Sequence, residues 1–189
     1  IGLSAKNALS NEISSYATDA AGYNVLGAVT SATVDGNKVD LTIQTGEKIR
    51  FTFLEENVFR MYMAPEGEDF REYPAANSSD HTATITNKTD DQYKTEYNVT
   101  PKLDETETTI TITTGKLKLE INKAETLMKL MRADGTVVWE EEAPLKYKTG
   151  STIQTLKTNQ NEYFYGGGTQ NGRFSHKGKS IKIVNTNNW

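Results

Sequence analysis

Three consecutive glycines at positions 166–168 stand directly before a dense run of polar side chains. Glycine lets the backbone take positive φ and lets another group approach the chain closely. The side chains that follow offer amide, guanidinium and imidazole groups, which can donate hydrogen bonds to sugar hydroxyls or accept them. This combination favours contact with a sugar over burial in a core. The glycines are Gly166, Gly167 and Gly168, and the candidate binding residues are Gln170, Asn171, Arg173, Phe174 and His176, with Phe174 as an apolar platform.

The same loop has a simpler interpretation, because Asn171-Gly172 is also a common hairpin turn. Loops with mixed polar groups occur often, and a binding loop needs a pocket that this chain alone need not contain. The chemistry of the residues leaves both interpretations open.

The sequence offers less support for a nucleotide site, a catalytic triad or a metal site at this loop. A nucleotide loop of the form Gly-x-Gly-x-x-Gly needs a glycine where Asn171 stands and a helix after it. Neighbours such as Ser175 and His176 rarely orient as nucleophile and base, so we do not expect a catalytic triad. The sequence has 2 histidines, His81 and His176, so we expect no metal site and no other cofactor.

Glycoside hydrolysis needs two carboxyl groups, one at the anomeric carbon and one that protonates the leaving oxygen. No pair of acidic residues stands out by its spacing. The acidic run 140–142 follows Trp139, which we expect in the core. Because neighbouring side chains on a strand point to opposite faces, we expect this run to solvate a sheet edge. The acidic groups at 66–69 and 90–91 do not follow a calcium-loop pattern, and we expect a solvated face there.

The remaining sequence predicts an all-β fold, an antiparallel β-sandwich. Short Val/Ile/Thr/Phe-rich runs alternate with Gly, Asn or Asp turns at the spacing of a sandwich, without intervening helices. Residues 64–80 are too polar and too broken by proline for a strand and predict a surface loop, and 126–132 would also suit a short helix. The predicted strands are 32–34, 39–43, 48–53, 58–63, 82–86, 93–99, 107–113, 116–122, 126–132, 137–141, 151–157 and 163–165. The predicted core residues in the cleanest alternation are Ile110, Ile112, Leu117, Leu119 and Ile121.

Length and charge limit the classes of function. The 189 residues, 35% of them hydrophobic, suffice for one sizeable core but not for a sandwich plus a barrel of about 250 residues. The net charge of -4, from 21 basic and 25 acidic residues without a block of one sign, argues against nucleic-acid and membrane partners. The absence of cysteine excludes disulfides and a cysteine nucleophile.

The end of the chain carries a family resemblance. Three motifs resemble the end of the N-terminal β-sandwich domain of glycoside hydrolase family 31. They are the segment Tyr165-Gly166-Gly167-Gly168-Thr169-Gln170, the pair Lys177-Gly178 and the asparagine-rich residues that precede Trp189. That family contains α-glucosidases, α-xylosidases and α-glucosyltransferases. Many members have a glutamate soon after the glycines, whereas Thr169-Gln170 resembles bacterial α-glucosyltransferases and related α-glucan or α-galactoside enzymes. This departure leaves the sugar open.

The resemblance implies a galactose-mutarotase-like supersandwich over residues 1–189, as a single domain at the N-terminal end of a larger enzyme. A catalytic (β/α)8 barrel would follow Trp189, carry both catalytic aspartates of a retaining double displacement and act on an α-linked oligosaccharide or glucan. The chain alone would then be inactive, and its loop would shape the sugar subsites through the residues named above. The resemblance also implies an extracellular or cell-surface bacterial protein, with a cytoplasmic location also compatible.

An all-β, Thr-rich, cysteine-free sequence also fits a non-catalytic carbohydrate-binding or adhesion domain, for which a planar row of exposed aromatic side chains would be evidence. A complete sugar mutarotase shares the superfamily fold but would need suitably placed histidines and acids and a longer chain, and the two histidines of this sequence argue against it. The tyrosines available for such a row are Tyr23, Tyr62, Tyr73, Tyr93, Tyr97 and Tyr147.

Overall fold

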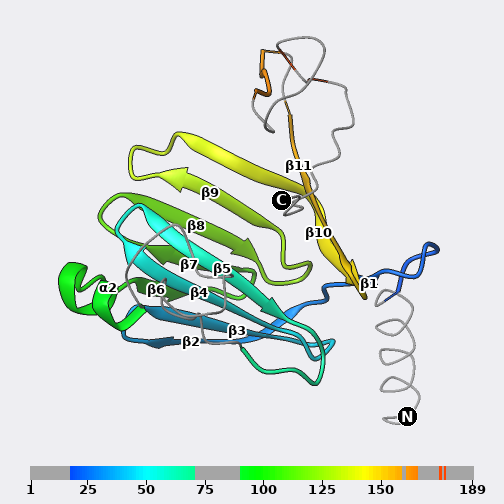
Figure 1. The fold of residues 1–189 in the computed structure, drawn as a ribbon, viewed down its shortest axis with the longest axis horizontal. Helices are drawn as coiled ribbons and strands as arrows, with labels where there is room; N and C mark the ends of the chain where they lie inside the picture. Colours follow the sequence, from blue (N-terminus) through cyan, green and yellow to red (C-terminus); the bar gives the residue numbers. More distant parts are fainter. Residues whose placement is uncertain (1–17, 71–89, 159–160, 166–174, 176, 178–189) are drawn as a thin grey trace, which may run out of the picture. The chain divides into compact units, whose positions relative to one another are not determined.

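The computed structural model describes residues 18–70, 90–158, 161–165, 175 and 177. The chain divides into two compact units, residues 1–156 and residues 157–189, and each is considered by itself. The regular elements of the described residues all belong to the first unit (Figure 1). They are β1 (Asn24–Val25), β2 (Val29–Asp35), β3 (Lys38–Ile43), β4 (Lys48–Glu55), β5 (Val58–Ala64), α2 (Asp90–Tyr97), β6 (Lys102–Glu105), β7 (Thr109–Thr113), β8 (Leu117–Asn122), β9 (Met128–Arg132), β10 (Val137–Lys148) and β11 (Ser151–Leu156).

The smaller sheet is a meander of four antiparallel strands in the order β2-β3-β4-β5. Its hairpins form where glycine allows positive φ: Gly36 turns β2 into β3 at φ 57°, and Gly46 turns β3 into β4 at φ 101°. Across β3 and β4, Val39 pairs with Phe51 and Leu41 with Ile49, so alternate apolar residues share one face. Each hairpin therefore brings the apolar faces of neighbouring strands into register.

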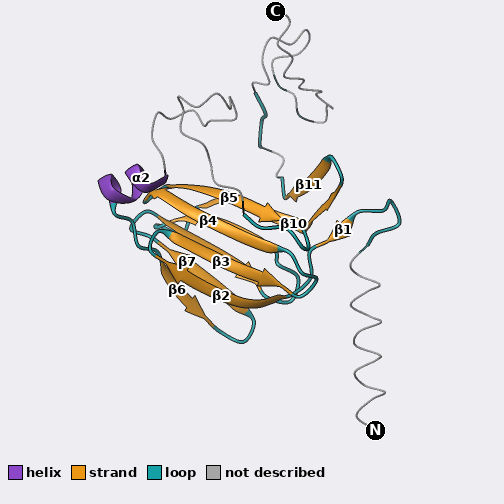
Figure 2. Cartoon of the chain, turned by 60° about the horizontal axis from the view of Figure 1, so that its bottom comes forward, coloured by secondary structure: helices purple, strands orange, loops and turns teal. Residues whose placement is uncertain are grey.

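The larger sheet has seven strands in the order β1-β10-β9-β8-β7-β6, with β11 also paired to β10 (Figure 2). The first part of β10 pairs with β9, and the later part pairs with both β11 and β1. Register shifts separate Glu141, Ala143 and Lys146 along the β10–β11 ladder. Bulges of this kind bend a strand and increase its twist, so β10 passes from one set of neighbours to another.

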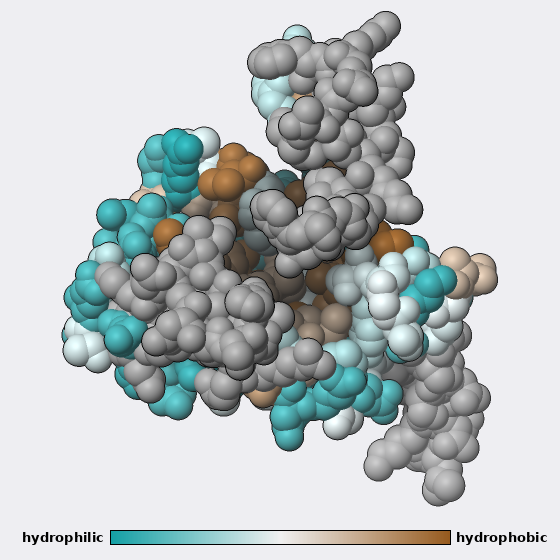
Figure 3. Space-filling model, in the orientation of Figure 1, coloured by the Kyte–Doolittle hydropathy of each residue, from teal (hydrophilic) through white to brown (hydrophobic). Residues whose placement is uncertain are grey.

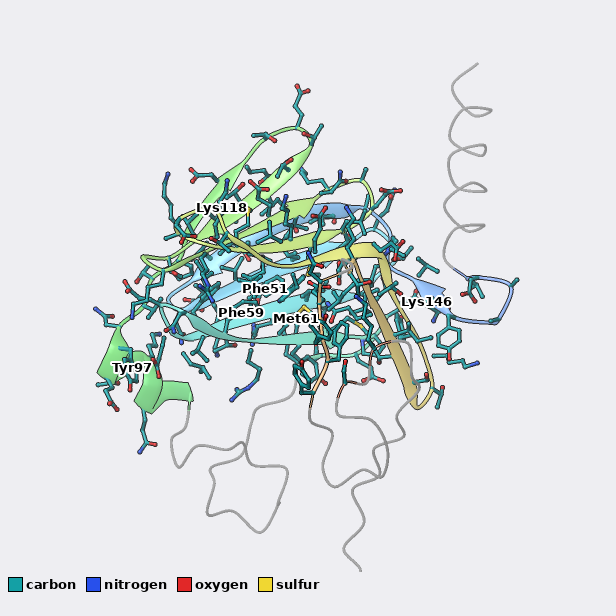
Figure 4. All side chains as sticks on the ribbon, turned by 90° about the horizontal axis from the view of Figure 1, so that it is seen from above. Phe51, Phe59, Met61, Tyr97, Lys118 and Lys146 are labelled. Atoms are coloured by element: carbon teal, nitrogen blue, oxygen red, sulfur yellow. The ribbon has the colours of Figure 1, made fainter. Side chains whose placement is uncertain are left out.

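One hydrophobic core joins the two sheets. Phe51 and Phe53 from the smaller sheet and Ile112 and Leu119 from the larger sheet belong to the same buried cluster. The Phe51 ring meets the Phe59 ring edge to face at a centroid distance of 5.8 Å, and Figure 4 shows both residues with Met61 in the sandwich. Figure 3 shows hydrophobic surface of the described residues near the middle of the face drawn there. The partly buried apolar residues that pack against the core are Ala32, Phe59, Met61, Met63, Leu103, Leu130 and Trp139.

The all-β sandwich predicted from the sequence is confirmed. The five residues predicted to be buried on β7 and β8 are buried, and 126–132 contributes the strand β9 rather than a helix. The strand β6 was not predicted. The predicted strand 82–86 and residues 71–80 of the predicted surface loop lie outside the described residues.

One predicted strand is wrong. Residues 93–99 were expected to be extended, but 90–97 form α2, and Val99, just after the helix, is buried. The helix ends at Tyr97, and the next residue, Asn98, takes φ 46° and donates its backbone N–H to the Lys94 carbonyl at 3.1 Å. A polar run satisfies its backbone hydrogen bonds within a helix, whereas a strand would need a partner strand and an apolar face to bury.

The packing of Phe51 gives a stability test. Replacing Phe51 by Ala should lower the free energy of unfolding by about 3–5 kcal/mol, because the ring is fully buried between the sheets. Urea denaturation followed by circular dichroism measures the change. Val137→Ala, at a largely exposed residue, is the control and should change the free energy of unfolding by less than about 1 kcal/mol. Equal effects of the two substitutions would contradict the assignment of the core.

Candidate functional site

The sugar-binding loop predicted from the sequence lies outside the described residues. This applies to Gly166, Gly167 and Gly168, to the candidate binding residues Gln170, Asn171, Arg173, Phe174 and His176, and to Trp189. Their assignment stays a prediction. The described residues closest to them in the sequence are 161–165 on one side and Ser175 and Lys177 on the other.

An aromatic triplet directly precedes the glycines. The exposed fractions are 63% for Tyr163, 45% for Phe164 and 58% for Tyr165. The rings of Tyr163 and Tyr165 stack with centroids 6.3 Å apart and an interplanar angle of 16°. The prediction of a strand at 163–165 is wrong, because these residues belong to no strand in the described part of the chain.

Ser175 makes a local contact of the kind found in turns. Its hydroxyl oxygen accepts the backbone N–H of Lys177 at 3.5 Å. This bond caps the backbone two residues further on and does not prepare the hydroxyl for nucleophilic attack. The geometry at Ser175 is that of a loop residue.

Among the described residues of the first unit, two carboxylates are buried, and each has an exposed fraction of 2%. The first, Glu47, lies beside the turn between β3 and β4. Its Oε1 accepts the phenol O–H of Tyr147 at 2.9 Å, and its Oε2 accepts the hydroxyl of Thr45. Burial raises the pKa of Tyr147, and its hydrogen bond to Glu47 acts in the same direction. The contact ties the smaller sheet to β10.

The second buried carboxylate corrects a prediction. Glu141 was expected to solvate a sheet edge with its neighbours, but its Oε2 accepts the Met128 backbone N–H at 2.9 Å and its Oε1 accepts the Gln154 amide at 2.8 Å. Burial raises the pKa of the Glu141 carboxyl, and the two hydrogen bonds offset part of that rise. Glu141 thus connects β10 to β9 and β11 beside a bulge. Trp139, expected in the core, is partly buried against it.

Neither buried acid is arranged for glycoside hydrolysis. Both oxygens of each carboxylate already accept a hydrogen bond from the protein, whereas an acid or base must reach the substrate directly or through one water. Within the described residues, no group of three or more His, Cys, Asp or Glu side chains could hold a metal ion. A search of the same residues found no helix long and apolar enough to span a membrane.

A pocket of about 260 Å³ lies in the first unit, next to a strained turn. Leu26, Gly27 and Pro144 contribute to its mainly apolar lining, and Glu125 lies at the turn between β8 and β9. In that turn the buried Thr126 takes φ 53° and donates its hydroxyl to the Gly27 carbonyl. A β-branched residue at this φ is strained, and the hydrogen bond to Gly27 compensates for part of the strain. The strain therefore has a structural explanation.

The tyrosines considered for an aromatic binding row have other surroundings. Tyr147 is buried, Tyr62 meets the Phe70 ring edge to face at 6.1 Å, and Tyr23 lies 4.2 Å from the Lys148 ammonium. Tyr97 ends α2. Tyr73 and the side chain of Tyr93 are outside the described part of the chain. The near-parallel pair that the structure does contain, Tyr163 and Tyr165, was expected as a strand and not as a ring platform.

Residues 48–189 match the family model described as glycosyl hydrolase 31 N-terminal galactose mutarotase-like domain. The match covers more than half of the chain and confirms the resemblance predicted from the sequence. No match was found among curated proteins.

Solved structures with the same fold include a GH31 dextranase from Flavobacterium johnsoniae in complex with isomaltotriose, at 20% identity and a TM-score of 0.68, which aligns over 82% of this chain and 18% of the dextranase. The cycloalternan-forming enzyme from Listeria monocytogenes, in complex with a pentasaccharide substrate, aligns over 82% of this chain and 14% of its own, at 21% identity and a TM-score of 0.59. The chain therefore spans less than a fifth of each relative. At these identities the likeness establishes the fold.

The pH dependence of the free energy of unfolding tests the burial of Glu141. Its pKa is raised in the folded state, so its contribution to stability is fully present below the pKa of the unfolded carboxyl and is lost as pH rises through the folded pKa. Glu141→Gln removes the titration and keeps the shape of the side chain. The free energy of unfolding of the wild type, relative to Glu141→Gln, should rise as pH falls from 7 to 4.

Urea denaturation at several pH values measures this difference. Glu142→Gln, at the exposed neighbour, is the matched control for the loss of one carboxylate. Parallel pH profiles of Glu141→Gln and the wild type would show that the carboxyl does not titrate differently on folding.

Proposed function

Because the chain belongs to the family of glycosyl hydrolase 31 N-terminal galactose mutarotase-like domains, we propose that it is the accessory domain of a carbohydrate-active enzyme, either an α-glycoside hydrolase or a transglycosylase. The observation that carries the proposal is the family match over residues 48–189, which includes the glycines and the polar loop after them. The sandwich supports a catalytic barrel, and the loop contributes to the sugar pocket.

The parent enzyme cleaves or transfers an α-linked oligosaccharide or glucan by a retaining double displacement. Both catalytic aspartates lie on the barrel, and this chain has no catalytic role of its own. Support for the substrate class comes from the relatives, whose structures contain isomaltotriose and a pentasaccharide substrate. We further propose an extracellular or cell-surface bacterial location, since a polymeric glucan meets its enzyme outside the cell.

In this proposal, the role of each loop residue follows from the chemistry of its side chain. Arg173 and Gln170 donate hydrogen bonds to sugar hydroxyls, and Phe174 offers an apolar face. The buried carboxylates of Glu47 and Glu141 hold the strands around β10 together through their hydrogen bonds to Tyr147 and to the Met128 backbone. The sandwich thus supplies a rigid support, and the loop supplies the contacts.

One observation favours a second function, a carbohydrate-binding module that works without a barrel. The stacked and exposed rings of Tyr163 and Tyr165 are the kind of surface that such a module uses. The two functions differ in what the chain does by itself: a module binds sugar firmly, whereas an accessory domain binds weakly or not at all.

Activity measurements separate the two functions. The full-length parent should hydrolyse or transglycosylate aryl α-glucosides and α-glucan oligosaccharides, and the 189-residue chain should be inactive on both. Isothermal titration of the chain with the same sugars should show weak or no binding. Activity of the isolated chain would contradict the proposal, and firm binding together with an inactive parent would establish the module instead.

The loop is tested by Arg173→Ala in the parent enzyme. Losing a charged hydrogen-bond donor to the substrate should lower kcat/KM about 10- to 100-fold, since such bonds contribute about 1.5–3 kcal/mol. The melting temperature should not change. Arg132→Ala, at an exposed arginine of β9, is the matched control and should leave kcat/KM unchanged. Equal kcat/KM values for both variants would remove Arg173 from the site.

A further inference from the structure

We propose that residues 18–23 act as a strap on the hairpin that β10 and β11 form. The strap fastens the tip of this hairpin, where Lys148 pairs with Ser151, and it sets how often β11 separates from β10 while the rest of the sandwich stays folded. This inference goes beyond the proposed function and does not depend on it. It starts from β11, because none of the 6 residues of this strand is buried.

The attachment of β11 to the core is weak. Its backbone ladder to β10 is interrupted by register shifts between Glu141 and Ala143 and between Ala143 and Lys146. The strand β10 places Leu145 and Tyr147 in the hydrophobic core, whereas no residue of β11 belongs to that cluster. Segments with few buried apolar contacts open locally at a lower free energy than core strands do. The strand β11 can therefore open without the core.

A tyrosine of the strap contacts both strands of the hairpin. The Tyr23 hydroxyl lies 3.1 Å from the hydroxyl of Ser151, the first residue of β11. The centroid of the Tyr23 ring lies 4.2 Å from the Lys148 ammonium and 5.2 Å from the Lys146 ammonium, and both lysines belong to β10. The negative face of an aromatic ring attracts such cations. Tyr23 thus holds the end of β10 and the beginning of β11 together.

A carboxylate shapes the strap and joins it to β10. The Oδ1 of Asp19 accepts the backbone N–H groups of Ala21 and Tyr23, each at 2.9 Å. Its Oδ2 accepts the ammonium of Lys146 (Figure 4) at 2.6 Å, and this hydrogen bond is the main reason why the pKa of Asp19 is lowered. Both side chains are partly exposed, so dissolved salt screens their attraction. The strap is therefore sensitive to ionic strength.

The strand that the strap holds is also the strand that leads out of the first unit. It ends at Leu156, and the second unit begins with Lys157. When β11 opens, the chain loses its last strand pairing before the glycines and the candidate binding residues. The strap limits this opening.

Hydrogen exchange of the 189-residue chain, followed by NMR, tests the strap. Asp19→Asn keeps an oxygen for the two backbone N–H groups but removes the charge that pairs with Lys146. In this variant the backbone amides of residues 151–156 should exchange about two- to fivefold faster, which is the factor expected for the loss of a partly exposed ion pair. The amides of β3, β4, β7 and β8 should exchange at the wild-type rate.

A matched control, a second variant and salt complete the test. Asp69→Asn removes an ion pair of the same 2.6 Å length, which joins Lys48 of β4 to the chain after β5, and it should leave the exchange of residues 151–156 unchanged. Tyr23→Ala, which removes the ring and its hydroxyl, should accelerate exchange at the same amides as Asp19→Asn. Sodium chloride at about 1 M should accelerate their exchange more in the wild type than in Asp19→Asn.

Two results would overturn the proposal. Equal acceleration in β11 and in the core strands of Asp19→Asn would show that this residue contributes only to global stability. Unchanged exchange of residues 151–156 in both Asp19→Asn and Tyr23→Ala would show that β11 opens independently of the strap. Neither result bears on the proposed function, because the measurement involves neither a sugar nor the parent enzyme.

Discussion

Burial of one apolar face from each sheet in a shared core is the constraint on which the first unit depends. Neither sheet can cover its own apolar face, so Phe51 and Phe53 need Ile112 and Leu119 opposite them. Removal of this apolar surface from water is the main favourable term for such a fold. The register of each hairpin matters because a shift by one residue would turn the apolar side chains to the solvent.

The strand β10 adds a second constraint, since it contacts three neighbours and carries bulges. A bulge interrupts the ladder, and side chains can replace the backbone bonds that are lost there. Glu141 does this by accepting bonds from β9 and β11, while Tyr147 of β10 donates to Glu47 in the turn between β3 and β4 and so ties the two sheets together. Such buried polar groups are tolerated because every one of them has a partner among the described residues.

The function that we propose follows from this division between a rigid sandwich and a polar segment beyond it. The last strand of the described residues, β11, ends at Leu156, and the aromatic and polar residues of the candidate site follow in the second unit. Sites are commonly placed on connecting segments that a stable scaffold supports. The family match supports our proposal of a parent enzyme whose barrel carries the reacting groups, with this chain as its support and as a source of sugar contacts.

The sequence by itself determined the fold class, most strands and the family, because alternation along a strand and glycine in a tight turn are local signals. It also located Ile110, Ile112 and Leu119 in the core for the same reason. Only the tertiary structure decided that 90–97 is helical and that Glu141 is buried, since the environment of a polar side chain depends on strands distant in the sequence. It also decided that Tyr163 and Tyr165 stack on each other with exposed side chains, because a short aromatic run is typical of a strand and only the backbone geometry showed that 163–165 belongs to no strand in the described part of the chain.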